Sequence, residues 1–468
     1  MSFTAYDIHE WLDEAEVAHR LLRADGAVWT SENSLASRIL HGAVVDSRQS
    51  QAAYLFVAMQ GERQHGADFL VQSFERGASA ALVENKIPGA QGFEQPVFLV
   101  EDMHAALFAL ARGWLHKHPT TVIGITGSNG KTTTKDMAKA ALSDREVGVS
   151  PGNLNSRIGL PLAVLSQPDQ LDFLVLEMGA SRKGEIAALS ECVRPRIGCV
   201  TNVGAAHLEN FGDLEGVLVE KSALLQNLPP QGCAVLPGDD ANYERLLQAS
   251  RAGENVSFGK GKKCDVRLQK CQQTAEGLRV KVQGVEVVLP LFGEANGLNA
   301  AAACAIAKVA GVEIEDALPR IAEVAVSPHR SRFVRRAGCV ILDDCYNANP
   351  SSMESALSSL AKLPVKGRKI AILGSMAELG PESTNLHRRV VARAHELGID
   401  ELVPVGRQMI FATDEQADPE QNLSALGREI AKGLREGDAV LLKASRSVGL
   451  ETVLESLLEE LSARGGDD

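Results

Sequence analysis

The stretch from residue 123 to residue 134 constrains this chain more than any other part of its sequence. It reads Ile-Gly-Ile-Thr-Gly-Ser-Asn-Gly-Lys-Thr-Thr-Thr, an apolar strand followed by a glycine-containing turn and the start of a helix. In such a loop, glycines let backbone N–H groups surround phosphate oxygens, the Lys131 ammonium neutralises the β- and γ-phosphates, and the Thr132 hydroxyl binds Mg²⁺. The stretch therefore predicts a site for a nucleoside triphosphate.

The loop departs in one respect from the commonest phosphate-loop pattern, which has a glycine where this chain has Ile125. Gly124 and Gly127 flank that position instead, which weakens the usual kinase or GTPase interpretation. A nucleotide loop still explains the pattern better than the alternative, a plain turn between a strand and a helix. The residues expected to contact the nucleotide are Gly127, Ser128, Asn129, Gly130, Lys131, Thr132 and Thr133.

Composition limits the class of protein that carries this loop. With 468 residues the chain is longer than one hydrophobic core usually supports, so two to three domains are expected. A formal net charge of −12 without a dense basic run argues against nucleic-acid binding. Because there is no basic N-terminal region before an apolar stretch, and no run of about 18 apolar residues, we expect a cytoplasmic enzyme without membrane insertion. The eight cysteines form no CxxC pair, so neither disulfides nor zinc are indicated.

Strand-like and helical stretches alternate along the chain in three segments. Residues 1–102 contain short apolar runs around a helical stretch, which is typical of a small α/β unit. Between residues 103 and 326, apolar strands end in polar residues, the pattern of a parallel sheet whose ligands gather at the strand C-terminal ends. Residues 256–291 alternate polar and apolar side chains, which predicts a few antiparallel strands added to that sheet. The alternation then restarts and predicts a doubly wound domain over residues 327–468.

Three polar residues of the middle segment are candidates for the chemistry, and each has an ordinary structural alternative. Glu177 ends an apolar strand, where a carboxylate binds the Mg²⁺ of a nucleotide directly or through water; the alternative is a capping or surface glutamate. His207 follows another strand in a loop of small residues, but a lone histidine is more often structural. Lys221, from the sequence alone, is an ordinary lysine on a helix face.

Two motifs of the third segment are rich in hydrogen-bonding groups. Residues 343–350 read Asp-Asp-Cys-Tyr-Asn-Ala-Asn-Pro, which favours a functional loop, although turn chemistry alone also explains Asn and Pro. Lys443-Ala-Ser445-Arg446 follows a strand and opens a helix, which suits a carboxylate or phosphate at the helix N-terminus. The alternative for this second motif is a solvated turn.

Together these stretches resemble the Mur ligases, ATP-dependent amide-forming enzymes of peptidoglycan precursor synthesis, over the whole chain. Thr-Gly-Ser-Asn-Gly-Lys-Thr-Thr matches the family's ATP loop, and residues 152–162 are similar to its substrate-side loop. The blocks at 201–212, 343–350, 378–387 and 443–446 are similar in particular to the branch that adds D-alanyl-D-alanine to UDP-N-acetylmuramoyl-tripeptide. The resemblance implies an α/β fold of three domains. These are an N-terminal UDP-substrate-binding domain, a central P-loop parallel-sheet ATPase domain and a C-terminal Rossmann-like domain that binds adenosine and the dipeptide.

The resemblance also implies roles that the patterns leave open. Thr132, Glu177 and His207 would be Mg²⁺ ligands, and Lys221 matches a position where a lysine is carbamylated by CO₂ and holds a second Mg²⁺. Lys131, Lys221 and His207 would then be the catalytic set. The further residues expected at the adenosine and phosphates of ATP are Asn296, Asn299, Arg332, Asp343 and Asn347. Those expected at UDP-N-acetylmuramoyl-tripeptide or D-alanyl-D-alanine are Ser47, Arg48, Asn153, Asn155, Tyr346, Asn349, Lys443, Ser445 and Arg446.

A few positions depart from the family pattern. Ser156 stands where the branch commonly has a second Asn, Ala295 where a His precedes Asn296, and Ser375 where Gly-Asp-Met is more usual. His65 and Ala67 likewise break an Asp-Gly-His pattern in the first domain. These departures affect expected substrate, adenine and UDP contacts, whereas the expected chemical core is present.

The expected reaction activates the tripeptide carboxylate with the γ-phosphate of ATP and then joins the acyl phosphate to the amine of D-alanyl-D-alanine. Two alternatives stay open. One is another ligase of the superfamily, the tripeptide-forming Mur ligase or folylpolyglutamate synthase, and the other is a P-loop protein that uses ATP as a conformational switch. The sequence leaves unassigned the general base and the third residue of the tripeptide, meso-diaminopimelate or lysine. It does not fix the oligomeric state either, and we expect a monomer.

Overall fold

A computed structural model describes residues 3–29, 34–86, 89–90, 92–204, 208–325, 327–413 and 422–464 of the chain. Its contacts define two compact units. The first comprises residues 1–124, 144–180 and 184–196, and the second comprises residues 125–143, 181–183 and 197–468. Within the described ranges, no helix combines the length and the apolar character needed to cross a lipid bilayer.

The N-terminal part of the chain contains a five-stranded sheet with the order β2-β7-β6-β5-β4. All neighbouring strands pair in parallel except β2, which runs antiparallel to β7. The strands are β2 (His19–Arg23), β4 (Gly42–Val44), β5 (Tyr54–Ala58), β6 (Ala80–Glu84) and β7 (Pro96–Val100). A short pair is formed by β1 (Phe3–Thr4) and β3 (Ile39–Leu40), and the helices are α1 (Ala5–Glu14), α2 (Leu70–Glu75) and α3 (Met103–Lys117).

Local sequence explains where these elements begin. Thr4 caps α1 by a capping box, because its hydroxyl accepts the Asp7 N–H while the Asp7 carboxylate accepts the Thr4 N–H. All five residues of β7 are buried, as expected of an apolar strand covered on both faces. The predicted small α/β unit is confirmed here.

The middle part is built on a nine-stranded sheet with the order β16-β15-β14-β13-β12-β11-β8-β10-β9. Its strands are β8 (Thr121–Thr126), β9 (Val147–Val149), β10 (Phe173–Glu177), β11 (Ile197–Val200), β12 (Cys233–Pro237), β13 (Glu254–Gly259), β14 (Val266–Thr274), β15 (Gly277–Val282) and β16 (Val285–Leu289). Its helices are α4 (Lys131–Ala141), α5 (Gly159–Leu165), α6 (Glu185–Val193), α7 (Leu208–Phe211), α8 (Leu214–Gln226), α9 (Tyr243–Ala249), α10 (Glu294–Val309) and α11 (Ile314–Ala322).

The prediction for residues 256–291 is confirmed for most of that range and needs one correction. Strands β14, β15 and β16 pair antiparallel. Strand β13, however, runs parallel to both of its neighbours, β12 and β14. Its burial pattern of two exposed and four buried residues is that of a strand in the parallel core, where polar-apolar alternation is not required.

The C-terminal part is a doubly wound domain, as predicted. Its sheet has the order β17-β18-β21-β19-β20, with β17 antiparallel at one edge and all other pairs parallel. The strands are β17 (Arg332–Arg336), β18 (Cys339–Asp344), β19 (Lys369–Gly374), β20 (Glu401–Val405) and β21 (Ala439–Lys443). The helices are α12 (Pro350–Lys362), α13 (Ser383–Glu396), α14 (Arg407–Thr413), α15 (Leu423–Gly433) and α16 (Glu451–Arg464).

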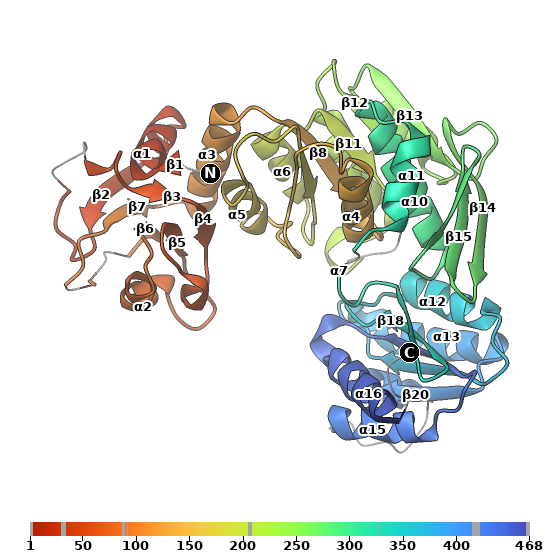
Figure 1. The fold of residues 1–468 in the computed structure, drawn as a ribbon. Helices are drawn as coiled ribbons and strands as arrows, with labels where there is room; N and C mark the ends of the chain where they lie inside the picture. The colour runs from red at the N-terminus through yellow and green to blue at the C-terminus, as the bar shows by residue number, and fades with distance from the viewer. Residues whose placement is uncertain are drawn as a thin grey trace. The chain divides into compact units, whose positions relative to one another are not determined.

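Alternate residues of the C-terminal strands pack into two separate hydrophobic cores. In β19, Ala371 and Leu373 pack with apolar side chains of α12 and α13, whereas Ile370 and Ile372 pack with those of α15 and α16. Figure 1 shows the two pairs of helices on opposite sides of this sheet. A period of two along the strand thus places helices on both faces of a parallel sheet.

Candidate active site

The backbone of the predicted phosphate loop requires glycine at two positions. Gly127 has a φ of 149° and Gly130 a φ of 81°, and both values lie in the region that side chains disfavour. A Cβ at Gly127 would overlap the Thr201 hydroxyl, and a Cβ at Gly130 would overlap the side-chain oxygen of Asn299. The loop therefore passes close to two polar side chains that only glycine leaves room for.

The chain that follows β11 holds this loop in place. The Thr201 hydroxyl donates to the Asn129 carbonyl oxygen at 2.6 Å, and Asn202 Nδ2 donates to the same oxygen at 2.9 Å. Asn202 Oδ1 accepts the Asn129 N–H at 3.0 Å, while the Ser128 hydroxyl donates to the Gly204 carbonyl oxygen at 2.8 Å. Because these bonds engage the main chain on both sides of Asn129, the loop geometry is fixed by the protein itself.

Lys131 and the two threonines after it form the first turn of α4. Lys131 Nζ donates to the carbonyl oxygens of Gly127 at 2.9 Å and Ser128 at 3.4 Å, so its ammonium lies over the loop. Thr132 and Thr133 are buried. The N-terminus of α4 adds partial positive charge at the same place, and loop, lysine and helix end together favour a polyanionic ligand.

The loop also contacts the start of α12. Asn349 caps this helix through a capping box with Ser352, and Pro350 occupies the first helical position. Asn349 Nδ2 donates to Asn129 Oδ1 at 2.9 Å, and Asn129 Nδ2 donates to the Ser351 hydroxyl at 3.2 Å. Asn349, which is expected to bind substrate, is thus hydrogen-bonded to Asn129, which is expected to bind the nucleotide.

Two asparagines predicted at the nucleotide lie buried on the first turns of α10. Asn296 Nδ2 donates to the Phe292 carbonyl oxygen at 2.7 Å, and Asn299 Nδ2 donates to Asn296 Oδ1 at 2.9 Å. Helix α10 packs against α4. This chain of bonds fixes the Asn299 side chain beside Gly130, at the end of the phosphate loop.

Glu177, the predicted metal ligand, is a buried carboxylate at the end of β10. Asn155 Nδ2 donates to its Oε1 at 2.6 Å, and the Ser150 hydroxyl accepts the Glu177 N–H at 3.1 Å. The Gly179 N–H donates to the Asn155 carbonyl oxygen at 2.9 Å, which ties the two segments together. The alternative was a capping or surface glutamate, and burial excludes the surface glutamate. Asn155 orients this carboxylate, a contact that the sequence did not indicate.

Lys221 lies on α8 with only 2% of its surface exposed, which corrects its interpretation as an ordinary helix-face lysine. Its Nζ lies 5.9 Å from the centre of the Phe211 ring. A lysine side chain is almost never fully buried unless its charge is paired. His207 lies outside the described residues.

Asp343 is fully buried at the end of β18 and is surrounded by polar groups. His329 Nδ1 lies 3.3 Å from its carboxylate, Cys345 Sγ donates to Oδ1 at 3.1 Å, and Arg332 approaches Oδ2 at 4.0 Å. Burial, and after it the nearby Asp343 carboxylate, raise the pKa of the Cys345 thiol, so this cysteine stays protonated. Asp343 Oδ2 is a buried oxygen that accepts no well-aligned hydrogen bond from the described residues, although His329 Nδ1 lies 3.3 Å from it. An unsatisfied acceptor of this kind suits a ligand hydroxyl.

Lys443 and Ser445 hold the loop after β18 rather than facing solvent. Lys443 is buried and its Nζ pairs with the Asp344 carboxylate, while also donating to the Asn347 carbonyl oxygen at 3.0 Å. The Ser445 hydroxyl donates to the Ala348 carbonyl oxygen at 3.3 Å. The alternative of a solvated turn is therefore wrong for Lys443 and Ser445, which are buried, whereas Arg446 of the same motif is exposed.

Tyr346 lies close to two guanidinium groups. Its ring centre is 3.8 Å from the Arg330 guanidinium carbon and 5.7 Å from that of Arg446. Arg446 also pairs with Glu451 at 3.1 Å. The stacked arginines form a cationic surface beside the loop, which suits an anionic or carboxylate-bearing ligand.

The residues predicted for the UDP-substrate lie in a short turn after β4. Ser47 is buried and donates to Gln72 Oε1 at 2.6 Å. Arg48 is largely exposed and pairs with Asp46 at 2.7 Å; its hydrogen bonds lower the pKa of the Asp46 carboxyl. Asn153 and Asn347, two further predicted residues, are exposed.

The positions that depart from the family pattern have structural contacts of their own. The Ser156 hydroxyl accepts the main-chain N–H three residues further on, at the start of α5, and Ser375 Oγ accepts an N–H of α14. His65 accepts the Ala67 N–H through Nδ1 at 3.0 Å and donates through Nε2 to a β6 carbonyl oxygen at 2.8 Å. Ala295 is exposed in the first turn of α10.

Three models of known domains match the chain in order. Residues 39–114 match the Mur ligase family catalytic domain, residues 125–307 the Mur ligase middle domain, and residues 329–446 the Mur ligase glutamate ligase domain. A Bacillus subtilis relative is 34% identical over 433 residues, which cover 90% of this chain and 94% of that relative. The chain therefore belongs to the Mur ligase family.

Two similar proteins of that family carry the same name. The Bacillus subtilis relative and one from Escherichia coli, 33% identical over 433 residues, are both named UDP-N-acetylmuramoyl-tripeptide--D-alanyl-D-alanine ligase. A crystal structure of MurF from Acinetobacter baumannii has a TM-score of 0.82 at 28% identity, covering 98% of this chain and 99% of that one. MurF from Thermotoga maritima, solved in complex with ADP, has a TM-score of 0.79 at 30% identity and covers 91% of this chain and 99% of that one. The predicted three-domain α/β fold is thereby confirmed.

Proposed function

We propose that this chain is an ATP-dependent amide ligase that joins D-alanyl-D-alanine to UDP-N-acetylmuramoyl-tripeptide, giving the pentapeptide precursor of peptidoglycan, ADP and phosphate. The observation that carries the proposal is similarity over 90% of the chain to ligases that bear this activity in their name. The phosphate loop, with its two required glycines and its lysine, supports the use of ATP.

The residues present fit a magnesium nucleotide. The loop leaves no room for a side chain at Gly127 or Gly130 and ends at a helix N-terminus, as suits a phosphate cradle. Asp343 offers a buried oxygen that accepts no well-aligned hydrogen bond from the described residues, which suits a hydroxyl of the nucleoside. Thr132 and Glu177 supply the hydroxyl and carboxylate oxygens that Mg²⁺ prefers.

In the proposed reaction the tripeptide carboxylate attacks the γ-phosphorus in line, forming an acyl phosphate as the bond to ADP breaks. Lys131 stabilises negative charge on the transferring phosphoryl group. Thr132, Glu177 and His207 would hold one Mg²⁺ and a carbamylated Lys221 a second, and these ions would add positive charge at the phosphates. The D-alanyl-D-alanine amine then attacks the acyl carbon, phosphate leaves, and the amine loses a proton to a base that we leave unassigned.

The remaining assignments belong to the same proposal. Ser47 and Arg48 are proposed for the UDP-substrate, with Asn153 and Asn155 on the tripeptide side. Asn296, Asn299, Arg332 and Asn347 are proposed for the nucleotide. Tyr346, Asn349, Lys443, Ser445 and Arg446 are proposed for the substrate side of the C-terminal domain. Domain limits at residues 1–102, 103–326 and 327–468, a monomer and a cytoplasmic location are proposed as well.

One alternative shares only the fold. A folylpolyglutamate synthase from Mycobacterium tuberculosis has a TM-score of 0.59 at 18% identity. Such a likeness indicates a common architecture and carries no information about the amine that is accepted.

The test is phosphate release by the purified chain with ATP and Mg²⁺, run as a matrix of acceptors and amines. Release should require UDP-N-acetylmuramoyl-tripeptide and D-alanyl-D-alanine together, and the product should be heavier by the dipeptide. Tripeptides ending in meso-diaminopimelate and in lysine run side by side identify the third residue. A mass increase of one amino acid, preference for glutamate and a folate, or phosphate release without an acceptor would contradict the proposal.

A further inference from the structure

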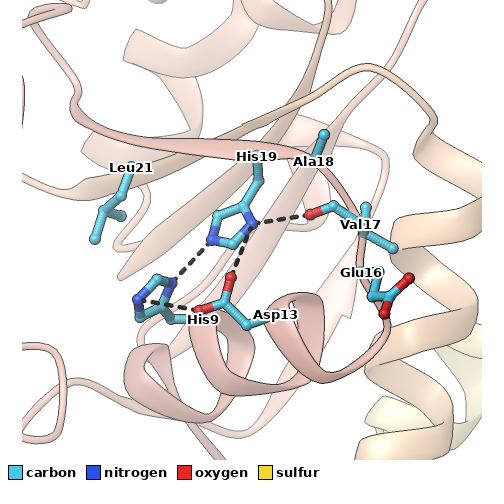
Figure 2. A pocket seen from close by; sticks show the side chains of 7 residues that line it. All are labelled: His9, Asp13, Glu16, Val17, Ala18, His19 and Leu21. Atoms are coloured by element: carbon cyan, nitrogen blue, oxygen red, sulfur yellow. Dashed lines mark hydrogen bonds and ion pairs between the residues drawn. The ribbon is translucent and has the colours of Figure 1, made fainter.

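A group of three potential metal ligands lies in the N-terminal part of the chain, within its first compact unit. His9 and Asp13 lie one turn apart on α1, and His19 opens β2. Figure 2 shows the three side chains pointing toward one another. They line a pocket of about 390 Å³. One ligand atom from each lies within 4.8 Å of the others. The family assignment gives this group no role.

The hydrogen bonds of His19 prepare one of its nitrogens to bind a metal ion. His19 Nδ1 lies 3.0 Å from the Val17 carbonyl oxygen, and because a carbonyl oxygen can only accept, Nδ1 carries the proton. Nε2 of the neutral ring is then left with a lone pair. A histidine that donates one ring N–H to a backbone carbonyl and presents the other nitrogen is the usual arrangement of a metal ligand. With 6% of its side chain exposed, His19 is also held in one orientation.

His9 meets His19 at a distance close to that of two ligands on one ion. His9 Nδ1 lies 2.8 Å from His19 Nε2, so a single proton joins the two nitrogens. Two nitrogens that each lie about 2.05 Å from one tetrahedral ion are roughly 3.3 Å apart. Increasing the distance between these two nitrogens by a few tenths of an ångström would let a metal ion take the place of that proton.

Asp13 supplies an anionic third group. Its carboxylate oxygens lie 3.6 Å from His9 Nε2 and 3.8 Å from His19 Nδ1, the two ring nitrogens outside the His9–His19 contact, so the carboxylate has to rotate to reach an ion held by His9 Nδ1 and His19 Nε2. The side chain is 62% exposed, so it can rotate toward an ion without breaking core packing. Residues four apart on a helix present their side chains on the same face, which is why His9 and Asp13 converge.

We propose that His9, Asp13 and His19 bind one divalent transition-metal ion of the Zn²⁺ class, with water from the pocket completing the coordination. Two imidazoles and one carboxylate favour Zn²⁺, Ni²⁺ or Cu²⁺ over Mg²⁺, which prefers oxygen ligands alone. The bound ion joins α1 to β2 and so stabilises this part of the fold. It is separate in the sequence from the residues proposed for the catalytic Mg²⁺, which begin at Thr132.

The test is a Zn²⁺ titration of the full-length protein by calorimetry in excess Mg²⁺, followed by thermal unfolding with and without Zn²⁺. The wild type should bind one Zn²⁺ at this site and gain thermal stability from it. His9→Gln should lose that binding, and Asp13→Asn should weaken it by about tenfold or more. His116→Gln removes an exposed histidine of α3 outside the group and should bind as the wild type does.

Equal Zn²⁺ binding by the wild type and both variants would overturn the proposal, because the metal would then be held elsewhere, for example by cysteines. Failure of the wild type to bind would overturn it as well. Circular dichroism without metal checks folding. If His9→Gln is poorly folded, Asp13→Asn decides, since its position is largely exposed. Phosphate release is not part of the readout, so the result is independent of the proposed ligase activity.

Discussion

The Lys131 ammonium has two kinds of partner: the ligand expected above the phosphate loop, and carbonyl oxygens of the loop itself. Its Nζ already donates to the Gly127 and Ser128 carbonyl oxygens, which places the ammonium before any ligand binds. Such preorganised charge stabilises a transition state more than a ground state, because it needs no rearrangement during the reaction.

Lys131→Ala should therefore lower turnover by about a thousand-fold while the protein stays folded. Steady-state phosphate release with both substrates measures the effect. Lys139→Ala is the matched control, because Lys139 lies on the same helix and is exposed. Near-normal turnover in Lys131→Ala would remove the basis for the nucleotide site.

Lys221→Ala should be inactive yet partly restored by small carboxylates such as acetate. The proposed carbamate is an anion on a buried side chain, and a small carboxylate could occupy the space left by the lysine and bind the second Mg²⁺. Turnover of Lys221→Ala against acetate concentration measures the rescue, and Lys221→Arg, which leaves no such space, should show none. Full activity of the alanine variant, or an unmodified Lys221 amine in a high-resolution nucleotide complex, would contradict the carbamate.

At the scale of single residues, local pattern predicted some positions and missed others for a physical reason. Gly127, Gly130 and Lys131 follow from sequence, because a tight loop and a phosphate charge need those residue types in that order. The burial of Lys221 and the bond from Asn155 to Glu177 were missed. Both depend on which segments pack together in three dimensions, and neither leaves a periodic signal.

At the scale of elements, the ends of strands carry most of the candidate site. Glu177 ends β10, Asp343 lies near the end of β18, and the chain after β11 holds the phosphate loop. The sequence indicated all three, because an apolar run that stops at a polar residue marks a strand end. The motif at Lys443 was harder to interpret, since a buried ion pair and a solvated turn have the same composition.

His387 on α13 binds the loop that follows β19 through a hydrogen bond. It is fully buried; its Nε2 accepts the Met376 N–H at 2.8 Å and its Nδ1 donates to the Ser383 carbonyl oxygen at 2.7 Å. Burial lowers the pKa of His387 below its ordinary value of 6.5, so the folded protein holds the ring neutral. A protonated ring has no acceptor for the Met376 N–H, and the loop would lose that bond.

Stability from His387 should be complete above pH 6.5 and lost as the pH falls toward the lowered folded-state pKa, because the unfolded chain then binds a proton that the folded chain does not. The denaturant midpoint should therefore drop more between about pH 7.5 and about pH 5.5 in the wild type than in His387→Gln. His395→Gln, an exposed histidine of the same helix, should keep the wild-type dependence. Identical pH dependence in all three proteins would show that His387 does not contribute.

At the scale of the whole molecule, the alternation of strands and helices in the sequence predicted the fold class. It did not predict how the segments group into two compact units. Residues 144–180 belong with the N-terminal unit, whereas residues 125–143 belong with the C-terminal one. The chain passes between the two units several times, and such crossings are not marked by a linker or a change of composition. Sequence patterns therefore divide the chain into segments, and contacts divide it differently.

Because the chain forms two compact units, we expect its thermal unfolding to take more than one step. Differential scanning calorimetry should show two transitions, and ADP with Mg²⁺ should raise only the one that belongs to the unit containing the phosphate loop. At a ligand concentration 100 times the dissociation constant, binding stabilises the folded unit by about 2.7 kcal/mol, which is enough to separate the peaks. UDP-N-acetylmuramoyl-tripeptide should raise the other transition, because Ser47 and Arg48 lie in the first unit. Lys131→Ala should lose most of the shift with ADP, and one transition that moves with either ligand would mean that the units unfold together.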